Sequence, residues 1–183
     1  MNRKEFMKTT IAGLGSLIVL PSCASNINPY RFFTVEEAKC VIALSEQIIP
    51  SDDEWPGASY AGVINYIDKQ LVEVFNEDQS KYRKGIQALQ MTCQKMFDKA
   101  FEELIFDVQM ELLHKIEKND VNRDHWQDQK PSDFFNMVIN HTMQGFYSSP
   151  RHGGNRNYLS YRMLDLDYPL IIGQNRYRGV HGQ

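Results

Sequence analysis

The sequence predicts an all-α fold, a single-domain bundle of about five helices with an irregular C-terminal segment. Apolar residues recur at steps of three and four in separate stretches, as they do along one face of an α-helix. No stretch alternates convincingly between apolar and polar residues, and the run Leu170-Ile171-Ile172 is too short to indicate a sheet. The 183 residues, 42% of them hydrophobic, are enough for one domain with a sizeable core.

Residues 1–23 are typical of an export signal. Arg3 and Lys4 give a positive start, and the apolar run that follows is too short to favour a membrane span. Residues 3–8 resemble a twin-arginine signal in which Lys4 replaces the second arginine, so the route, twin-arginine or general secretory, stays open. Residues 20–23 resemble a lipobox ending at Cys23, the expected site of lipidation. We therefore expect an exported bacterial protein, either periplasmic or held at the membrane as a lipoprotein.

A linker over residues 24–33 precedes the helical domain, for which we expect residues 34–183. Thr34 and Glu37 have the spacing of a capping box, which predicts that the first helix begins at Thr34. Apolar residues then recur at helical spacing until Pro50, where the helix is expected to end.

Four further helices follow in the prediction. The first is preceded by an acidic loop rich in turn-forming residues, residues 50–57, and the last by a polar loop, residues 119–130. Each stretch carries one apolar face and one polar face, as surface helices around a core do. The predicted helices run from Ala61 to Phe75, over 78–97, over 101–118, and onward from Pro131.

The run from His141 to Arg156 differs most from ordinary helical sequence. It contains the end of the last helix, two adjacent aromatic residues and a pair of glycines. Gly153 and Gly154 follow the helix and predict a turn, since glycine adopts backbone conformations that other residues avoid. The face of the helix that is expected in the core carries Phe135, Val138, Ile139, Thr142 and Phe146.

Each histidine of this run has two interpretations. His141 lies about 60° around the helix from Val138, at the border of the apolar stripe. That position favours a buried or interface histidine over a catalytic base. His152 lies in the turn, where glycine N–H groups together with Arg151 and Arg156 would bind an anion. A tight turn that docks onto a neighbour explains the same residues equally well, and both interpretations stay open.

Three other patterns favour ordinary structural roles. Residues 52–54 are acidic, but they lack the alternating ligands, glycine turn and distal Glu of a calcium loop, which favours a solvated or partner-facing loop. The formal charge of −3 and the absence of a basic cluster argue against nucleic acid as a partner. Cys40 and Cys93 lack a metal-like spacing and are expected to be buried, and whether they form a disulfide stays open.

Two motifs carry a family resemblance. The first is Ile-Ile-Pro-Ser-Asp-Asp-Glu-Trp-Pro-Gly-Ala at 48–58, followed by Ala61-Gly62-Val63 and Tyr66-Ile67-Asp68. The second is His-Thr-Met-Gln-Gly-Phe-Tyr at 141–147 with Gly-Gly-Asn-Arg at 153–156. In this order they resemble the N-terminal and C-terminal signatures of the gluconate 2-dehydrogenase subunit 3 family. Beyond them the family tends to a Gly-Trp-containing segment, where this chain has Ser160-Tyr161-Arg162.

The resemblance implies a non-catalytic small subunit of a membrane-bound, flavin-dependent sugar or polyol dehydrogenase. Such a subunit binds the large catalytic subunit and assists its maturation or, where a twin-arginine signal is present, its export. The resemblance places FAD on the large subunit and no cofactor on this chain, whose sequence contains no cofactor-binding motif. A cytochrome c subunit stays open as a further partner.

The two motifs are the expected partner interface, because Tyr, Trp and Arg contribute most of the binding energy at interface centres. The predicted contact residues are Trp55, His141, Phe146, Tyr147, Arg151, Gly153, Gly154, Asn155 and Arg156. One alternative is a stand-alone periplasmic lipoprotein that binds a small ligand or another protein. The other is an enzyme in which His141 and His152 converge with Asp52 or Asp53 on a substrate or metal.

Overall fold

The computed structural model describes residues 28–166, so the predicted export signal with Cys23 and the end of the predicted domain lie outside the described residues. Within 28–166, helices are the only regular secondary structure, which confirms the predicted fold class. The α-helices are α2 (Val35–Ile48), α3 (Ala58–Ala61), α4 (Val63–Glu73), α5 (Gln79–Phe97), α6 (Phe106–Glu117), α7 (Pro131–Tyr147) and α8 (Leu159–Met163). The 3₁₀ turns are η1 (Asn76–Asp78), η2 (Phe101–Glu103), η3 (Arg123–His125), η4 (Pro150–His152) and η5 (Arg156–Tyr158).

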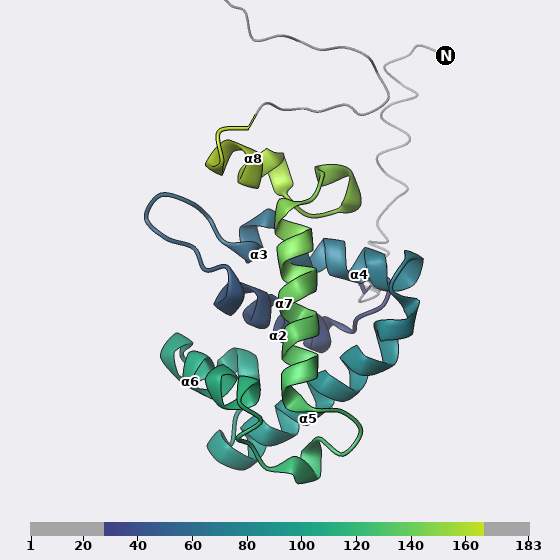
Figure 1. The fold of residues 1–183 in the computed structure, drawn as a ribbon, viewed down its shortest axis with the longest axis vertical. Coiled ribbons are helices and arrows are strands. Elements are labelled where there is room, and N and C mark those ends of the chain that lie inside the picture. The colour runs from purple at the N-terminus through teal and green to yellow at the C-terminus, as the bar shows by residue number, and fades with distance from the viewer. Residues whose placement is uncertain (1–27, 167–183) are drawn as a thin grey trace, which may run out of the picture.

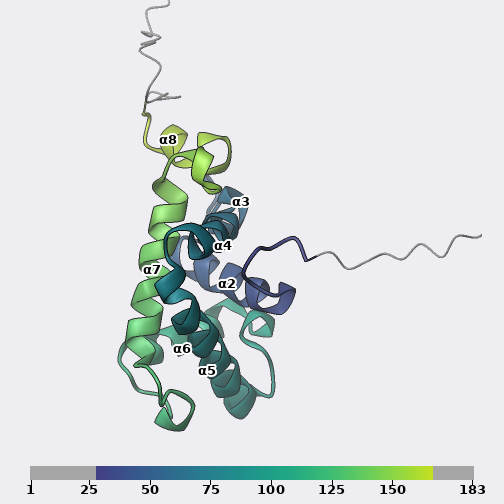
Figure 2. The same ribbon diagram turned by 90° about the vertical axis from the view of Figure 1, so that its right-hand side faces the viewer.

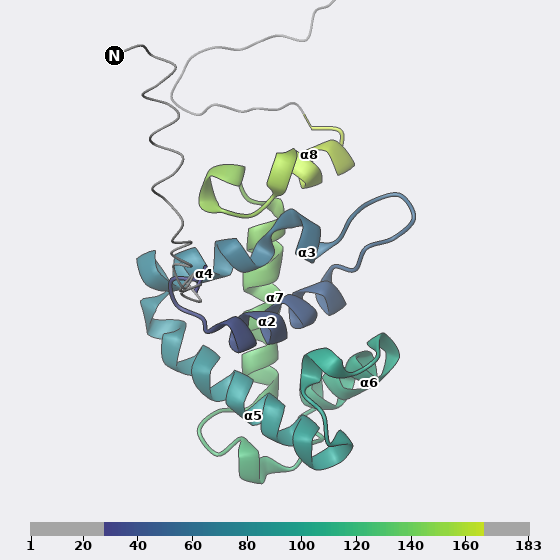
Figure 3. The ribbon, with the colours of Figure 1, turned by 180° about the vertical axis from the view of Figure 1, so that it is seen from behind.

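Helix α7 is the centre of the fold. It contacts α2, α3, α4, α5, α6 and α8, and it runs through the length of the described structure (Figure 1). Seen from behind, α2 crosses α7 near its middle, while α5 and α6 lie toward its N-terminal half (Figure 3). The side view places α8 and the turns before it over the C-terminal end of α7, beside α3 (Figure 2). Both motifs of the sequence therefore lie at the same end of the central helix.

The first helix begins as its sequence predicts. The Glu37 amide donates to Thr34 Oγ1 at 3.2 Å, and the Thr34 amide donates to Glu37 Oε2 at 2.8 Å. This reciprocal pair satisfies two N–H groups that the start of a helix leaves without partners.

The last residues of the predicted linker are held by the helical domain. Amides of Arg31, Phe32 and Phe33 donate to the Asp68 carboxylate at 2.7, 2.9 and 3.1 Å, and Phe33 is fully buried. No local pattern in the linker gave a sign of this, because Asp68 reaches the linker from α4, a different helix. Residues 31–33 thus pack as part of the domain.

Three helix details differ from the sequence prediction. The second predicted helix begins only at Val63, as α4, because Gly62 adopts a φ of +73° and separates it from the short helix α3. Residues 101–103 form a 3₁₀ turn, and α6 begins only at Phe106. In the first turn of α7 the buried aromatic is Phe134, whereas Phe135 and Ile139, both predicted in the core, are only partly buried. No helix in the described part of the chain has the length and apolarity to cross a membrane.

Candidate functional site

The two sequence motifs meet in space to form one surface at the end of α7. The turn η5 packs on α3, and η4 packs on α4. The Arg156 guanidinium lies over the Tyr60 ring, 6.0 Å from its centroid, and Lys69 Nζ donates to the Arg151 carbonyl at 3.3 Å. The segment after α7 is therefore attached to the helices that follow the first motif, and we call this surface, residues 50–62 with 148–163, the motif surface.

Glu46 organises the loop of the first motif from the last turn of α2. Its Oε1 accepts hydrogen bonds from the Ser51 amide at 2.9 Å and the Ser51 hydroxyl at 2.8 Å, and its Oε2 accepts one from the Ser59 amide at 2.9 Å. Burial would raise the pKa of Glu46, but the hydrogen bonds from Ser59 and Ser51 outweigh burial and lower it below the ordinary 4.5. The carboxylate thus bridges the two ends of the loop.

Gly57 is required where the loop returns to the helix. A Cβ at this position would lie 2.5 Å from the Ile49 carbonyl oxygen and 2.6 Å from Glu46 Oε1. The Gly57 amide donates to Ser51 Oγ at 2.8 Å, and the Ala58 amide donates to the Ile49 carbonyl at 2.9 Å. The loop is therefore a closed structure with its own hydrogen bonds.

Asp52 closes the tip of the loop. Its Oδ1 accepts from the Glu54 amide at 2.8 Å and the Trp55 amide at 2.6 Å, and its own amide donates to the Trp55 carbonyl at 2.9 Å. No group of three or more His, Cys, Asp or Glu side chains in residues 28–166 is arranged to hold a metal ion. The structure gives Asp52 a loop-closing role and leaves Trp55 half-exposed at the surface.

Three glycines let the second motif fold back on the central helix. A Cβ at Gly154 would overlap the carbonyl oxygen of Gly145, and a Cβ at Gly145 would lie 3.0 Å from the Tyr66 ring. Gly153 has a φ of +110° and packs against the backbone of Asn65. Because backbone approaches backbone here, the two glycines after α7 fit against the chain itself.

Asn155 fixes the turn from inside. It is fully buried, its Nδ2 donates to the Ser148 carbonyl at 2.8 Å, and its Oδ1 accepts from the Ser160 amide at 2.9 Å. Its backbone adopts a φ of +46°, a conformation that asparagine tolerates better than most residues. Asn155 therefore supports the motif surface and has no exposed surface for a partner to contact.

Backbone amides of the turn donate hydrogen bonds to carbonyl groups of the same turn. The His152 amide donates to the Ser149 carbonyl at 3.0 Å, and the Gly153 amide donates to the Pro150 carbonyl at 3.0 Å. These two N–H groups are not available to an anion in this structure. Of the two interpretations of the turn, the structure favours docking onto a neighbouring element, and that element is α4 of the same chain.

His141 is a core histidine. Its ring stacks on Phe75 with centroids 4.4 Å apart, its Nδ1 shares a 3.1 Å hydrogen bond with the Tyr82 hydroxyl, and its Nε2 lies 3.7 Å from Asp78 Oδ2. Burial lowers the pKa of His141 below the ordinary 6.5, while Asp78 opposes that effect and Lys81 adds to it. His141 is only 6% exposed, so it would shape a partner interface through packing and not through contact.

The aromatic pair of the second motif is divided between core and surface. Phe146 is 1% exposed, and Tyr147 is half-buried with its ring 5.0 Å from that of Phe146 in an edge-on arrangement. The predicted contact residues that do reach the surface are Trp55, Tyr147, Gly153, Arg151 and Arg156, and only the two arginines among them are exposed and not half-buried. Burial of Phe146 follows from its position on the inner face of α7.

Within residues 28–166, no hydrogen bond, ion pair or ring contact joins His141, His152 and Asp52, the residues of the alternative enzyme site. The hydrogen bonds, ion pairs and ring contacts of His141 go to side chains of α5 and of the segment before it, whereas His152 Nε2 accepts from Arg151 Nε at 3.0 Å. The polar contacts of Asp52 remain within its own loop. These three residues therefore have separate partners on separate elements, and their contacts give no support to the alternative in which they converge on a substrate or metal.

Cys40 and Cys93 are buried and free, as expected of small apolar side chains. Burial raises the pKa of Cys93 to about 12, with Glu102 adding to the effect. Burial, Glu102 and Cys93 likewise raise the pKa of Cys40. Neither thiol is poised to react as a thiolate.

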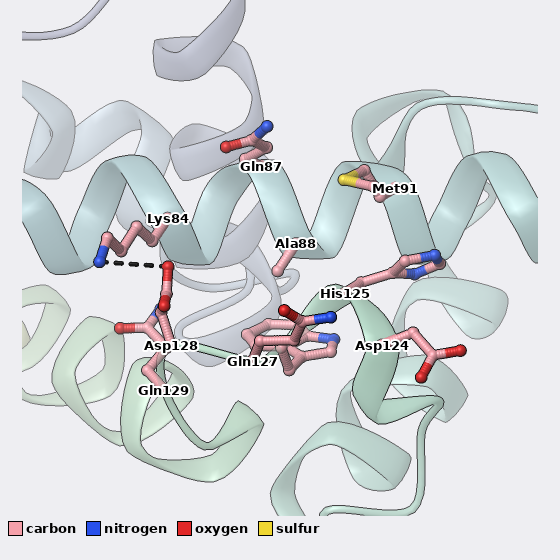
Figure 4. Close-up of a pocket in the computed structure, with 10 residues that line it drawn as sticks. Lys84, Gln87, Ala88, Met91, Asp124, His125, Gln127, Asp128 and Gln129 are labelled. Carbon is pink, nitrogen blue, oxygen red and sulfur yellow. Dashed lines mark ion pairs between the residues drawn. The ribbon is translucent and has the colours of Figure 1, made fainter.

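A hollow that sequence reasoning missed lies where residues 123–130 cross α5. Figure 4 shows Lys84 on α5 pointing toward Asp128, with Gln87 and Met91 farther along the helix. Lys84 Nζ and Asp128 Oδ2 form an ion pair at 3.2 Å. This cavity has a volume of about 200 Å³, and a neighbouring one of about 420 Å³ shares Lys84 and Asp128 with it. Among the described residues, His125 Nδ1 beside it is buried without a hydrogen-bond partner. Such contacts depend on two elements distant in sequence, so no local pattern could have revealed them.

Comparison with known proteins gives one family. The family model described as gluconate 2-dehydrogenase subunit 3 matches residues 35–167, more than half of the 183-residue chain. No curated protein and no solved structure matches the chain significantly. The matched region begins with α2 and includes both halves of the motif surface. The chain belongs to the gluconate 2-dehydrogenase subunit 3 family.

Proposed function

We propose that this protein is a non-catalytic small subunit that binds the large subunit of a flavin-dependent sugar or polyol dehydrogenase of the gluconate type and assists its maturation or export. The match of the family model over residues 35–167 carries the proposal. In this assignment FAD resides on the large subunit, and this chain binds no cofactor of its own. A cytochrome c subunit is a further candidate member of the complex.

The motif surface supports a binding role. It is built from two distant segments that hydrogen bonds and glycine contacts hold in one arrangement, and a preformed surface loses little conformational entropy on binding. Its exposed or half-exposed groups include Trp55, Arg151 and Arg156, and the half-buried Tyr147 directly precedes its second segment; these residue types contribute most at interface centres. The buried members of the prediction, Phe146 among them, hold these groups in place.

Export is part of the proposal. The signal-like start and the lipobox-like residues 20–23 support a periplasmic protein held at the membrane through Cys23. A diacylated cysteine attaches a protein firmly, so the partner would be recruited to the membrane surface without any helix in residues 28–166 having to span the membrane.

A second candidate function is that of a stand-alone lipoprotein that binds a small polar ligand. The two adjoining cavities beside residues 123–130 favour it, because Lys, Gln and Asp side chains line them. Their polar, open character would suit a weakly held ligand.

The deciding experiment is affinity purification of the tagged full chain from its own host under gentle extraction. We expect a large flavoprotein to co-elute, with flavin absorbance in the eluate and its gene beside the gene of this chain. Recovery of the chain alone, without flavin, would overturn the subunit assignment and leave the ligand-binding alternative. A tagged variant with the loop substitution Trp55→Ala serves as a matched comparison, because the half-exposed indole is expected to contribute to binding.

A further inference from the structure

The charges of this chain are separated along the sequence. The whole chain carries 23 acidic and 20 basic residues, but no Asp or Glu occurs from Phe134 to Leu164. The same stretch contains three arginines, Arg151, Arg156 and Arg162. A chain with a net formal charge of −3 therefore concentrates positive charge, free of carboxylates, in one continuous segment.

The fold places these arginines at one end of the molecule. Turns η4 and η5 and helix α8 cover the C-terminal end of α7 (Figures 1 and 3). Arg151, Arg156 and Arg162 are all exposed, and none of them forms an ion pair with a carboxylate in residues 28–166. Arg31, Lys69, Lys81, Arg83 and Lys84 each have an acidic partner. Lys118 and Arg123 also lack an ion pair within the described residues, but each is next to an acidic residue in the sequence.

The backbone that carries two of these arginines is rigidly seated. Gly154 packs on the Gly145 carbonyl, and Asn155 is hydrogen-bonded on both sides. The Arg156 guanidinium lies over Tyr60, and Arg151 is tied to α4 through its carbonyl. The backbone that carries these positive groups is thus already ordered, which lowers the conformational entropy lost on binding.

We infer that Arg151 and Arg156, with Arg162 beside them, form a docking surface for a carboxylate-rich patch on the large flavoprotein subunit. The inference rests on the proposed function and adds the chemistry of the contact. A planar guanidinium binds a carboxylate through two parallel hydrogen bonds, which gives orientation as well as attraction. Binding to acidic lipid is less well matched, because such sites use clusters of about four to eight Lys or Arg residues.

The test compares charge reversal here with charge reversal elsewhere. Arg151→Glu/Arg156→Glu is made in the tagged full chain, and Lys118→Glu/Arg123→Glu is the matched control. The control residues are exposed, lack ion pairs in the described part of the chain, and lie before α7 begins. Affinity for the co-expressed flavoprotein is measured by titration at several NaCl concentrations, with circular dichroism and thermal midpoints as checks of folding.

We expect the arginine variant to lose at least about tenfold in affinity, because like charges then face each other, while the control binds like the unmodified chain. The affinity of the unmodified chain should fall with salt, and Arg151→Gln/Arg156→Gln should weaken that dependence. A complex that forms equally well with the arginine variant would overturn this inference and leave the proposed function standing. If the unmodified chain bound no flavoprotein, the proposed function itself would fail.

A vesicle-binding measurement tests whether the negative charge that the arginines bind is on acidic lipid and not on the flavoprotein. The unlipidated Cys23→Ser chain is mixed with phosphatidylglycerol vesicles, with and without the two arginine substitutions. No arginine-dependent binding is expected. Vesicle binding that the arginine substitutions abolish, together with unchanged flavoprotein affinity, would assign the surface to lipid and overturn the inference.

Discussion

At the scale of single residues, the motif surface depends on close backbone contacts at glycine positions, where there is no room for a side chain. The sequence predicted a turn at Gly153 and Gly154, because paired glycines after a helix are a local signal. It did not predict that Gly154 must be glycine on account of Gly145, since that contact arises only when the turn folds back on α7. Asn155 was predicted as a partner contact, yet its side chain is used entirely within the turn.

Gly154→Ala should destabilise the domain. Its Cβ would overlap a backbone carbonyl oxygen that cannot move without shifting α7, so we expect a loss of about 3 kcal/mol in the free energy of unfolding. Gly145→Ala is the graded comparison, because its Cβ would meet the movable Tyr66 ring at 3.0 Å and alanine favours a helix by about 1 kcal/mol. Urea unfolding measures both, and equal losses would contradict the steric explanation.

His141 should make stability depend on pH. Its folded-state pKa lies below the unfolded value of 6.5, so the unfolded chain takes up a proton first as the pH falls. The contribution of the neutral ring to stability is complete above pH 6.5 and is lost as the pH drops through and below that value. Asp78, Lys81 and Tyr82 are the ionisable groups that face the ring, and Asp78 limits the effect.

His141→Gln tests this pH dependence. The amide can still meet the Tyr82 hydroxyl but does not titrate, so the thermal midpoint of the variant should change less between pH 7.5 and about pH 5. His114→Gln is the control, because His114 is exposed on α6. Equal pH dependence in the His141→Gln variant and the unmodified chain would assign the effect to other groups.

At the scale of elements, the sequence predicted features that depend on neighbouring residues, such as the ends of a helix. It did not predict contacts between separate elements. The capping box at Thr34 and the stop at Pro50 bounded α2 correctly, because both act within a few residues. The break at Gly62 was missed, since a glycine inside a helical pattern also occurs in unbroken helices. Periodicity placed Phe135 in the core in place of Phe134, because adjacent apolar residues leave the direction of the helix face uncertain by one position.

Glu46→Gln should loosen the loop of the first motif. A glutamine can accept hydrogen bonds through only one of its two terminal atoms, so one of the amides of Ser51 and Ser59 loses its partner. We expect a loss of about 1 kcal/mol in unfolding free energy and faster protease cleavage within residues 50–57. The control is Glu111→Gln on the exposed face of α6. Unchanged cleavage in the Glu46 variant would show that Glu46 does not hold the loop.

At the scale of the whole molecule, the sequence assigned the two motifs to one family but did not bring them together. Their meeting at one end of α7 depends on the packing of η4 and η5 against α3 and α4. The same packing separates the predicted interface residues into exposed groups and supporting groups. A family signature therefore marks both kinds of residue, and only the fold distinguishes them.

Cys23→Ser should move the mature protein from the membrane to the soluble fraction. Two acyl chains on a cysteine anchor a protein firmly, and none of the helices in residues 28–166 would replace that anchor. We expect the unmodified chain in the detergent phase after phase separation of host membranes, with a mass increase of the mature N-terminus, and the variant in the aqueous phase. Ser22→Ala is the control, because it leaves the acceptor thiol in place. An aqueous, unlipidated mature form of the unmodified chain would contradict the anchor, and any membrane attachment would then have to come from the flavoprotein partner.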